Sequence, residues 1–269
     1  MIRTFVKKLV TGVALAAALL PAVQARPLEE ILKSGVIRIG INPNSPPMSS
    51  MGAGNQYEGF DIDVGNAIAK GMNIKAEFIP TEVAQRIPFL TSNRADIMLG
   101  ALTRNPSRAL VIDYTLPLHT ESMSMLSTSK LNLKSWQELN NEKYTYVTVR
   151  STWTVDFLKE KLPKAKVLLV DANADAVRAV AQGRADAMVD LLDFYMAFTK
   201  NYPNVQWKRS SDTVYTAYCG IGVAKGNEGL VQFLNSQLYA MQSSGEVDQL
   251  WKKWFGQAMV VPVPHQPYF

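Results

Sequence analysis

The sequence contains few of the side chains on which most catalytic and metal-binding chemistry depends. Its 269 residues include one cysteine, Cys219, and two histidines, His119 and His265. These counts exclude an intramolecular disulfide and a metal site built from several cysteines or histidines. A phosphate-binding glycine loop, a Gly-x-Ser-x-Gly turn and a His-Glu-x-x-His motif are also missing. Because acid–base catalysis needs groups that titrate near the working pH, this sequence favours a binding protein over an enzyme.

An excess of charge of one sign is missing from most of the chain. The formal net charge is +5, from 28 basic and 23 acidic residues, but Arg3, Lys7 and Lys8 supply +3 of it within residues 1–25. Residues 26–269 are therefore nearly neutral, without the dense basic segment that nucleic-acid binding needs. Apolar residues make up 47% of the chain, which excludes a disordered protein. At about 150 residues per domain, the length predicts roughly two domains.

Residues 1–25 have the pattern of a secretory signal peptide. A basic stretch precedes the apolar run Leu9–Leu20, and Val23-Gln24-Ala25 provides the small residues of a cleavage site. A membrane anchor is the alternative, but the apolar run has 12 residues, whereas a spanning helix needs about 20. We therefore expect cleavage after Ala25 and a periplasmic mature protein that begins at Arg26.

The mature chain alternates between helical and strand patterns, which predicts an α/β fold with mixed sheets covered by helices. Helices are expected at 28–34, 64–72, 85–92, 134–140, 155–161, 174–182, 230–243 and 247–255, and strands at 36–41, 74–79, 96–102, 144–149, 167–170, 185–189 and 221–224. The proline-rich segment 42–56 and the carboxyl-terminal tail are expected to lack regular structure. The pattern restarts after Lys130, and Asn93–Met98 is similar to Gly183–Met188, 90 residues later. We therefore expect two similarly built modules.

Short motifs lie in a fixed order along residues 28–256. They are Gly59-Phe60-Asp61-Ile62-Asp63-Val64, Arg86-Ile87-Pro88-Phe89-Leu90, Arg94-Ala95-Asp96, Thr103-x-x-x-x-Arg108, Ile112-Asp113-Tyr114-Thr115-x-Pro117, Gly183-Arg184-Ala185-Asp186-Ala187, and Gly245 followed by Trp251-Lys252-Lys253-Trp254-Phe255-Gly256. Each motif is weak alone. Taken together, these motifs show that the chain resembles the periplasmic solute-binding proteins of polar amino-acid ABC transporters, the family 3 extracellular binding proteins.

The resemblance implies a type II periplasmic-binding-protein fold, in which two mixed-sheet α/β lobes are joined by two hinge strands. Residues 26–118 and 221–269 would form lobe 1, and residues 122–216 would form lobe 2. The hinges would lie near 118–122 and 217–220, with the ligand in the cleft between the lobes. The implied partners are an amino acid and an inner-membrane ABC permease, and we expect a monomer without cofactor or metal.

The resemblance also implies how the α-carboxylate of the ligand would be held. It places Arg108 and Thr103 at the arginine and the hydroxyl that the family uses, and it includes Ala101 among the ligand-binding residues. A guanidinium suits this role because its planar fork can meet both carboxylate oxygens. The alternative is a surface arginine after a turn at Pro106.

In lobe 2, Arg150-Ser151-Thr152-Trp153 precedes an expected helix. Hydroxyls and backbone amides at a helix amino terminus bind anions, so Thr152 is the first candidate for a ligand contact, with Ser151 beside it. Helix capping by Thr152 is the alternative. The family often has a glycine in this turn, and this chain has none.

The family holds the α-ammonium with an aspartate close to the position of Asp190. Asp193 is a competitor, because the family residue is usually one position further along than Asp190. A buried carboxylate without a cationic partner is costly, so we expect Asp190 to face the cleft.

The side-chain pocket departs from the family pattern. Ser45 and Val83 stand where relatives often have aromatic residues, and Met48 and Trp153 are possible substitutes. Asn42 takes a position that is often acidic or polar, and together with Arg150 it would favour a polar ligand. The identity of the ligand stays open.

Two classes of function follow from the resemblance. The first is a non-catalytic amino-acid receptor for an ABC importer. The second is an exported enzyme on the same fold, similar to the cyclohexadienyl dehydratases, for which Glu121, Asp190 and Asp193 are the candidate acids or bases. A sensor subunit is a third possibility that the sequence does not separate from the first.

Overall fold

The computed structural model describes residues 25–191, 195, 198–210 and 212–264. The expected signal peptide lies outside these residues apart from Ala25, as do Asp193 and His265.

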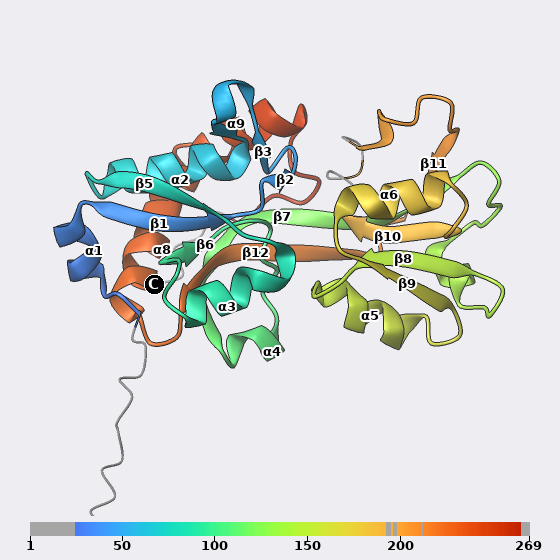
Figure 1. The fold of residues 1–269 in the computed structure, drawn as a ribbon, viewed down its shortest axis with the longest axis horizontal. Coiled ribbons are helices and arrows are strands. Elements are labelled where there is room, and N and C mark those ends of the chain that lie inside the picture. The colour runs from blue at the N-terminus through green and yellow to red at the C-terminus, as the bar shows by residue number, and fades with distance from the viewer. Residues whose placement is uncertain (1–24, 192–194, 196–197, 211, 265–269) are drawn as a thin grey trace, which may run out of the picture.

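Two long antiparallel strands form the centre of the molecule. Strands β7 (Ile112–Thr128) and β12 (Tyr215–Ala224) pair from Ala224 opposite Ile112 to Tyr215 opposite Met123. The register of this pair shifts on both sides of Gly220. Figure 1 shows both strands running from one group of helices and strands to a second group. These groups are the two lobes, which confirms the two-lobed α/β fold class.

The first lobe contains both ends of the described chain. Its helices are α1 (Leu28–Ser34), α2 (Phe60–Gly71), α3 (Arg86–Thr91), α4 (Pro106–Ala109), α8 (Glu228–Ser243) and α9 (Glu246–Phe255), and its main strands are β1 (Val36–Ile41), β5 (Lys75–Pro80) and β6 (Ile97–Met98). Strand β1 pairs in parallel with β5 and β6, whereas β12 pairs antiparallel with β6. Helices α8 and α9 pack against each other and against α2, so the end of the chain joins the lobe that its beginning builds.

The second lobe is smaller and is built on the far ends of the long strands (Figure 1). It contains α5 (Trp153–Lys161), α6 (Asn173–Ala181), β8 (Thr145–Val149), β9 (Lys166–Val170), β10 (Ala187–Leu191) and β11 (Trp207–Arg209). In the described part of the chain, the large sheet has the order β5-β1-β6-β12-β7-β10-β8-β9, with β11 paired to β7.

The core lies between the sheet and the helices of each lobe. In the first lobe, Ile37 and Ile39 of β1 pack with Phe60 of α2, and in the second lobe Val147 of β8 packs with Val177 of α6. All five side chains are fully buried. Burial of one such side chain contributes about 1.5–3 kcal/mol, so the alternating apolar residues hold the helices on the sheet.

The similar motifs at 93–98 and 183–188 have the same structural role in the two lobes. Asp96 accepts a hydrogen bond from the backbone amide of Arg38 at 2.7 Å, and Asp186 accepts one from the amide of Thr145 at 2.7 Å. Each aspartate therefore fastens the strand that follows it to the neighbouring parallel strand. Asp96 also forms ion pairs with Arg26 and Arg38, which tie the beginning of the expected mature chain to the first lobe.

Several predicted elements need correction. Segment 42–56 contains the short strands β2 (Asn44–Ser45) and β3 (Ser49–Met51), which form a small sheet with β4 (Tyr57–Glu58). The helix expected at 134–140 is a 3-10 turn, Trp136–Leu139. The strand expected at 96–102 shrinks to β6 because Gly100 and Ala101 have φ angles of 86° and 54°, which end an extended strand. The other predicted helices and strands are confirmed, the helix 28–34 and the strand 36–41 with the predicted ends, the rest with shifted ends.

The resemblance implied a hinge strand through 118–122, but the residue pattern did not predict the long strand β7. Its central part carries buried polar side chains, among them His119, Glu121 and Ser124. Both faces of this part are covered, so the polar–apolar alternation that marks a half-exposed strand is missing.

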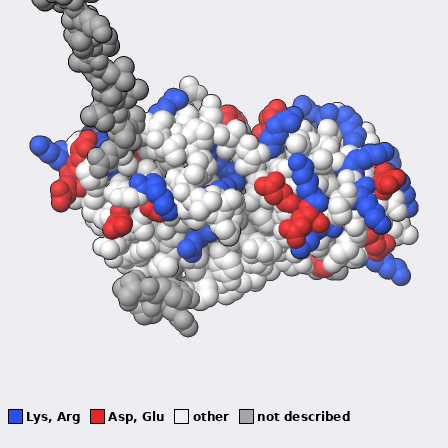
Figure 2. Space-filling model, turned by 90° about the horizontal axis from the view of Figure 1, so that it is seen from below, with Lys and Arg blue, Asp and Glu red and all other residues white. Residues whose placement is uncertain are grey.

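The surface agrees with the nearly neutral composition. On the face that Figure 2 shows, basic and acidic side chains lie interspersed among uncharged ones. No described helix has the length and apolar character needed to cross a bilayer.

Candidate ligand-binding site

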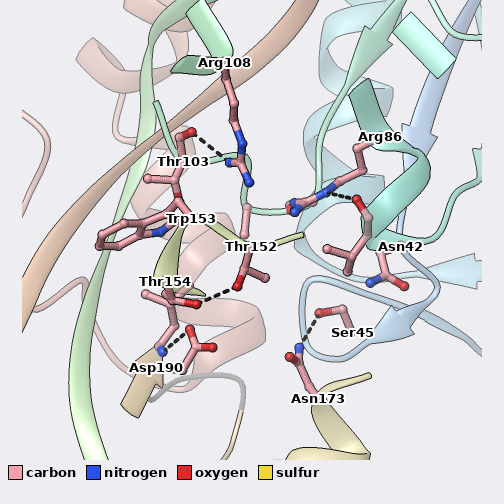
Figure 3. A pocket seen from close by; sticks show the side chains of 14 residues that line it. Asn42, Ser45, Arg86, Thr103, Arg108, Thr152, Trp153, Thr154, Asn173 and Asp190 are labelled. Atoms are coloured by element: carbon pink, nitrogen blue, oxygen red, sulfur yellow. Dashed lines mark hydrogen bonds between the residues drawn. The ribbon is translucent and has the colours of Figure 1, made fainter. Parts of the chain in front are cut away.

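A polar pocket lies between the two lobes (Figure 3). Its lining residues are Asn42, Ser45, Val83, Arg86, Gly100, Ala101, Thr103 and Arg108 from the first lobe, and Thr152, Trp153, Thr154, Asn173, Asp190 and Leu191 from the second. The structure thus brings together nine of the residues that the sequence and the resemblance singled out: Asn42, Ser45, Val83, Ala101, Thr103, Arg108, Thr152, Trp153 and Asp190.

Arg108 reaches from the short helix α4 toward the second lobe. Asn105 caps this helix, since its side-chain oxygen accepts a hydrogen bond from the backbone amide of Arg108 at 2.9 Å. The guanidinium donates to the Thr103 carbonyl at 3.1 Å and, across the cleft, to the Ser151 carbonyl at 3.2 Å. Arg108 forms no ion pair within the described residues. Therefore no carboxylate of the described residues is paired with the positive charge of Arg108.

In the first lobe, Thr103 and Ala101 line the same pocket as Arg108. Thr103 is buried, and its hydroxyl lies 3.8 Å from the sulfur of Cys219 on β12. Ala101 lines the pocket in a left-handed conformation. A residue other than glycine in this conformation costs about 1–3 kcal/mol, and such strain is common where a backbone turn presents its groups to a ligand.

The turn before α5 contains a second strained residue. Ser151 has a φ of 59°, so it takes the left-handed conformation without the glycine that the family often has here. The expected side-chain contact from Ser151 is not seen at the pocket lining. Its carbonyl accepts from Arg108 instead.

The hydroxyl of Thr152 does not cap α5. It donates to the Val149 carbonyl at 2.6 Å and lies 2.6 Å from the hydroxyl of Thr154, which in turn lies 2.8 Å from that of Thr148. The capping alternative for Thr152 is therefore wrong. The backbone amides at the amino terminus of α5 remain without a side-chain cap from Thr152.

Arg150 lies away from the pocket lining. Its guanidinium donates to Asp171 at 2.8 Å and to the Leu169 carbonyl at 3.0 Å, with about half of its side chain (54%) exposed. The expectation that Arg150 faces the ligand is corrected accordingly, because a nearby surface carboxylate satisfies it. Met48 is also absent from the lining, since it is fully buried within the first lobe.

Asp190 is the penultimate residue of strand β10 and lines the pocket. Its residue is 5% exposed, and one carboxylate oxygen accepts a hydrogen bond from the backbone amide of Leu191 at 2.9 Å. Burial raises the pKa of Asp190 to about 6. A carboxylate with this cost of desolvation gains stability from a cation placed beside it.

Three polar lining residues were missed in the sequence. Arg86 is buried at the start of α3 and donates to the carbonyl of Gly100 at 2.6 Å. Asn173 donates to the hydroxyl of Ser45 at 3.4 Å, which forms a second contact between the lobes. Thr154 is the third missed residue, and its hydroxyl lies 2.6 Å from that of Thr152. The motif Arg86-Ile87-Pro88-Phe89-Leu90 was noticed, and an arginine at the first position of an otherwise apolar helix was the signal that could have identified Arg86.

A buried cluster lies behind the pocket. Ligand atoms of His119, Glu121 and Cys219 lie within 4.8 Å of one another, and among the described residues this is the group whose types could hold a metal ion. The carboxylate of Glu121 faces the ring of His119 at 3.4 Å and accepts from the Cys219 thiol at 3.4 Å. Glu121 does not line the pocket.

Two lobes on crossing strands, with a charged pocket between them, define a two-lobed ligand-binding protein. The family model of the bacterial extracellular solute-binding proteins, family 3, matches residues 37–257. The chain belongs to this family.

Individual relatives cover most of the chain. The ABC transporter glutamine-binding protein of Bacillus subtilis (strain 168) is 30% identical over 74% of this chain and 73% of its own length. The ABC transporter arginine-binding protein 1 of Escherichia coli (strain K12) is 25% identical over 82% of this chain and 91% of its own. Among solved structures, the ancestral amino-acid-binding protein AncCDT-1, a precursor of cyclohexadienyl dehydratase, is 32% identical with a TM-score of 0.77, over 84% of this chain and 98% of its own.

Proposed function

We propose that the protein is an extracytoplasmic receptor that binds a free α-amino acid and delivers it to an ABC importer. The observation that carries this proposal is the pair of opposite charges in the pocket, Arg108 from the first lobe and the buried Asp190 from the second. A free amino acid carries the complementary pair, a carboxylate and an ammonium, on one carbon atom. The relatives named for glutamine and arginine binding support this proposal.

In this proposal each lobe holds one end of the ligand. Arg108 and the Thr103 hydroxyl bind the α-carboxylate, and the amides at the start of α5 add donors from the other side. Asp190 binds the α-ammonium. A ligand that touches both lobes favours the closed arrangement by its differential affinity for it.

The proposed hinge motion uses the two long strands. Residues 26–118 with 221–269 and residues 122–216 would move as bodies about 118–122 and 217–220. The register shifts beside Gly220 support a bend at this place. The contacts of Arg108 with Ser151 and of Asn173 with Ser45 join the lobes, and opening would break both.

We expect the amino-acid-bound protein to have a smaller radius of gyration than the free protein, because the ligand bridges the lobes. Small-angle scattering at saturating ligand measures this change. The Arg108→Ala variant at the same ligand concentration is the control, and it should keep the larger radius. An unchanged radius for the wild type at saturation would contradict the hinge.

Affinity should depend on pH through Asp190, because the ammonium needs an ionised partner. Burial raises the pKa of Asp190 to about 6 in the free protein. Binding should therefore be constant above about pH 7 and weaken below about pH 6, toward a factor of ten per pH unit. Calorimetric titrations across this range measure the effect, and Asp190→Asn should lack it. Equal wild-type affinity at about pH 5 and about pH 8 would show that Asp190 does not hold the ammonium.

A thermal-shift screen of the mature protein against the proteinogenic amino acids, followed by calorimetry of the hits, tests the function itself. At least one amino acid should raise the melting temperature and bind saturably, because a ligand that binds only the folded state stabilises it. No hit in the whole set would overturn the proposal.

The enzyme alternative is tested with the same preparation. Asp190 is the carboxylate among the described lining residues, and the receptor needs it ionised beside an ammonium. We therefore expect no aromatic product on incubation with prephenate or arogenate. Turnover that Asp190→Asn abolishes would favour a dehydratase-like enzyme instead.

A periplasmic location with cleavage after Ala25 is part of the proposal. It rests on the signal pattern, the family, and the ion pair between Arg26 and Asp96 in the first lobe. Mass spectrometry of periplasmic protein should give Arg26 as the first residue.

A further inference from the structure

A histidine, a glutamate and a cysteine lie side by side where the two long strands pair. Cys219 of β12 is directly opposite His119 of β7, and Glu121 is two residues further along β7. Directly opposite residues of an antiparallel pair lie on the same face, and so do residues two apart in one strand. The pairing of the strands therefore gathers three side chains of metal-binding type.

The distances between these three groups match those of a metal site. Nε2 of His119 lies 3.4 Å from one carboxylate oxygen of Glu121, and the other oxygen lies 3.4 Å from the sulfur of Cys219. One ligand atom from each residue lies within 4.8 Å of the other two. With bonds of about 2.0–2.3 Å, neighbouring ligand atoms of a tetrahedral zinc ion are roughly 3.4–3.6 Å apart. Small side-chain movements would therefore bring all three groups to bonding distance.

The burial of the cluster makes its charge balance important. His119, Glu121 and Cys219 are 2%, 1% and 0% exposed. A buried carboxylate without a cation is costly, and among the described residues Glu121 pairs with His119, which is charged only when protonated. A zinc ion with a carboxylate, a thiolate and a neutral imidazole carries no net charge. On metal binding the thiol would lose its proton to solvent and the imidazole would keep its proton on Nδ1.

The surroundings of His119 suit a metal-bound imidazole. Its ring packs against the rings of Phe60 and Trp251, with centroids 5.5 Å and 5.1 Å away. Nδ1 of His119 is buried and has no hydrogen-bond partner among the described residues, and the same is true of Oδ1 of Asp61. Burial raises the pKa of Asp61 to about 6, and the charge of His119 opposes this rise. Because metal-bound histidines usually donate their second ring N–H to a carboxylate, Asp61 is the acceptor expected for Nδ1.

We infer that His119, Glu121 and Cys219 form a zinc-binding site within the pair of long strands. The mixed set of nitrogen, oxygen and sulfur ligands suits Zn²⁺, whereas Mg²⁺ and Ca²⁺ prefer oxygen ligands alone. The metal would join β7 and β12 at the proposed hinge segments 118–122 and 217–220. It would also lie directly behind the pocket, because the hydroxyl of the lining residue Thr103 is 3.8 Å from the Cys219 sulfur. This inference differs from the sequence-based expectation of a protein without metal.

The test is calorimetric titration of residues 26–269, stripped of metal with a chelator, with Zn²⁺ and separately with Mg²⁺. Wild type should bind one Zn²⁺ per chain and no Mg²⁺, and Zn²⁺ should raise its melting temperature. Asp61→Asn should weaken zinc binding by about 10–100-fold, and Cys219→Ser and His119→Gln should each weaken it more. His265→Gln is the matched control, because it removes the second of the two histidines, and it should bind Zn²⁺ as wild type does.

Cobalt provides a readout of the sulfur bond itself. Co²⁺ in place of Zn²⁺ should give a thiolate-to-metal charge-transfer absorption in wild type and in His265→Gln, but not in Cys219→Ser. If circular dichroism shows that a variant does not fold, the wild-type zinc stoichiometry and cobalt spectrum decide.

The contrary results are equally defined. A wild-type protein that takes up no stoichiometric Zn²⁺, or whose cobalt complex lacks the charge-transfer band, overturns the inference. Zinc binding that survives unchanged in Cys219→Ser, or that disappears in His265→Gln, identifies an adventitious surface site and overturns it as well. None of these measurements requires an amino acid, so the inference and the proposed function can fail separately.

Discussion

Replacement of Arg108 by alanine is expected to weaken amino-acid binding by roughly two to three orders of magnitude. The variant leaves the α-carboxylate of the ligand in the cleft without its charged partner, and breaking a buried ion pair costs about 3–5 kcal/mol. Every 1.4 kcal/mol corresponds to about a factor of ten in affinity. Arg108 also donates to the Ser151 carbonyl across the cleft, so the closed state loses a contact between the lobes.

Calorimetry with the best amino acid from the screen measures this loss. Arg108→Lys should also bind poorly, because an ammonium lacks the planar fork that meets both carboxylate oxygens. Arg104→Ala removes the same charge from an exposed position in the same segment and should bind as wild type does. Wild-type affinity in Arg108→Ala, or equal binding of the decarboxylated ligand, would refute this site.

Replacement of Asp190 by asparagine should reduce affinity by a similar factor, of roughly 100 or more, through the other end of the ligand. The expected effect on the free protein has the opposite sign. Burial raises the pKa of Asp190 to about 6, which means that the ionised group is destabilised in the folded state at neutral pH. An isosteric neutral side chain removes this cost, so the free variant should melt at the same temperature as wild type or higher.

The two measurements together separate a binding role from a structural one. A residue that only supports the fold would lower the melting temperature and the affinity in parallel. Asp190→Asn is expected to lower the affinity alone. A variant that melts well below wild type at pH 7 would contradict the assignment of Asp190 as a group kept for the ligand.

The residues of the site differ in how far the sequence could predict them. Thr103 and Arg108 are five positions apart and meet through a local turn, since Arg108 donates to the Thr103 carbonyl. A motif can therefore place them together. Arg86 is different, because it turns into the pocket to reach the carbonyl of Gly100, which lies 14 residues away. The motif contained Arg86, but only the packed lobe decided its direction.

In the second lobe, too, the local sequence did not determine which side chains face the pocket. Arg150 and Thr152 stand two positions apart before α5, yet Arg150 pairs with Asp171 on the surface while Thr152 lines the pocket. Asp171 follows a neighbouring strand, and no local sequence pattern predicts that it forms an ion pair with the Arg150 guanidinium. Competition between partners that are distant in sequence decided which of these side chains faces the ligand.

The sequence by itself determined the α/β class, most helices and strands, the two modules and the order of the family motifs, because these depend on local periodicity and turn residues. The tertiary structure alone decided how far the two hinge strands extend as β7 and β12. The polar centre of β7 is buried on both faces and so carries no alternation. It also decided that Arg86 and Arg108 share one pocket with Asp190. Charges from three separate segments meet only when the two lobes pack across those strands, and their balance is a property of that packing.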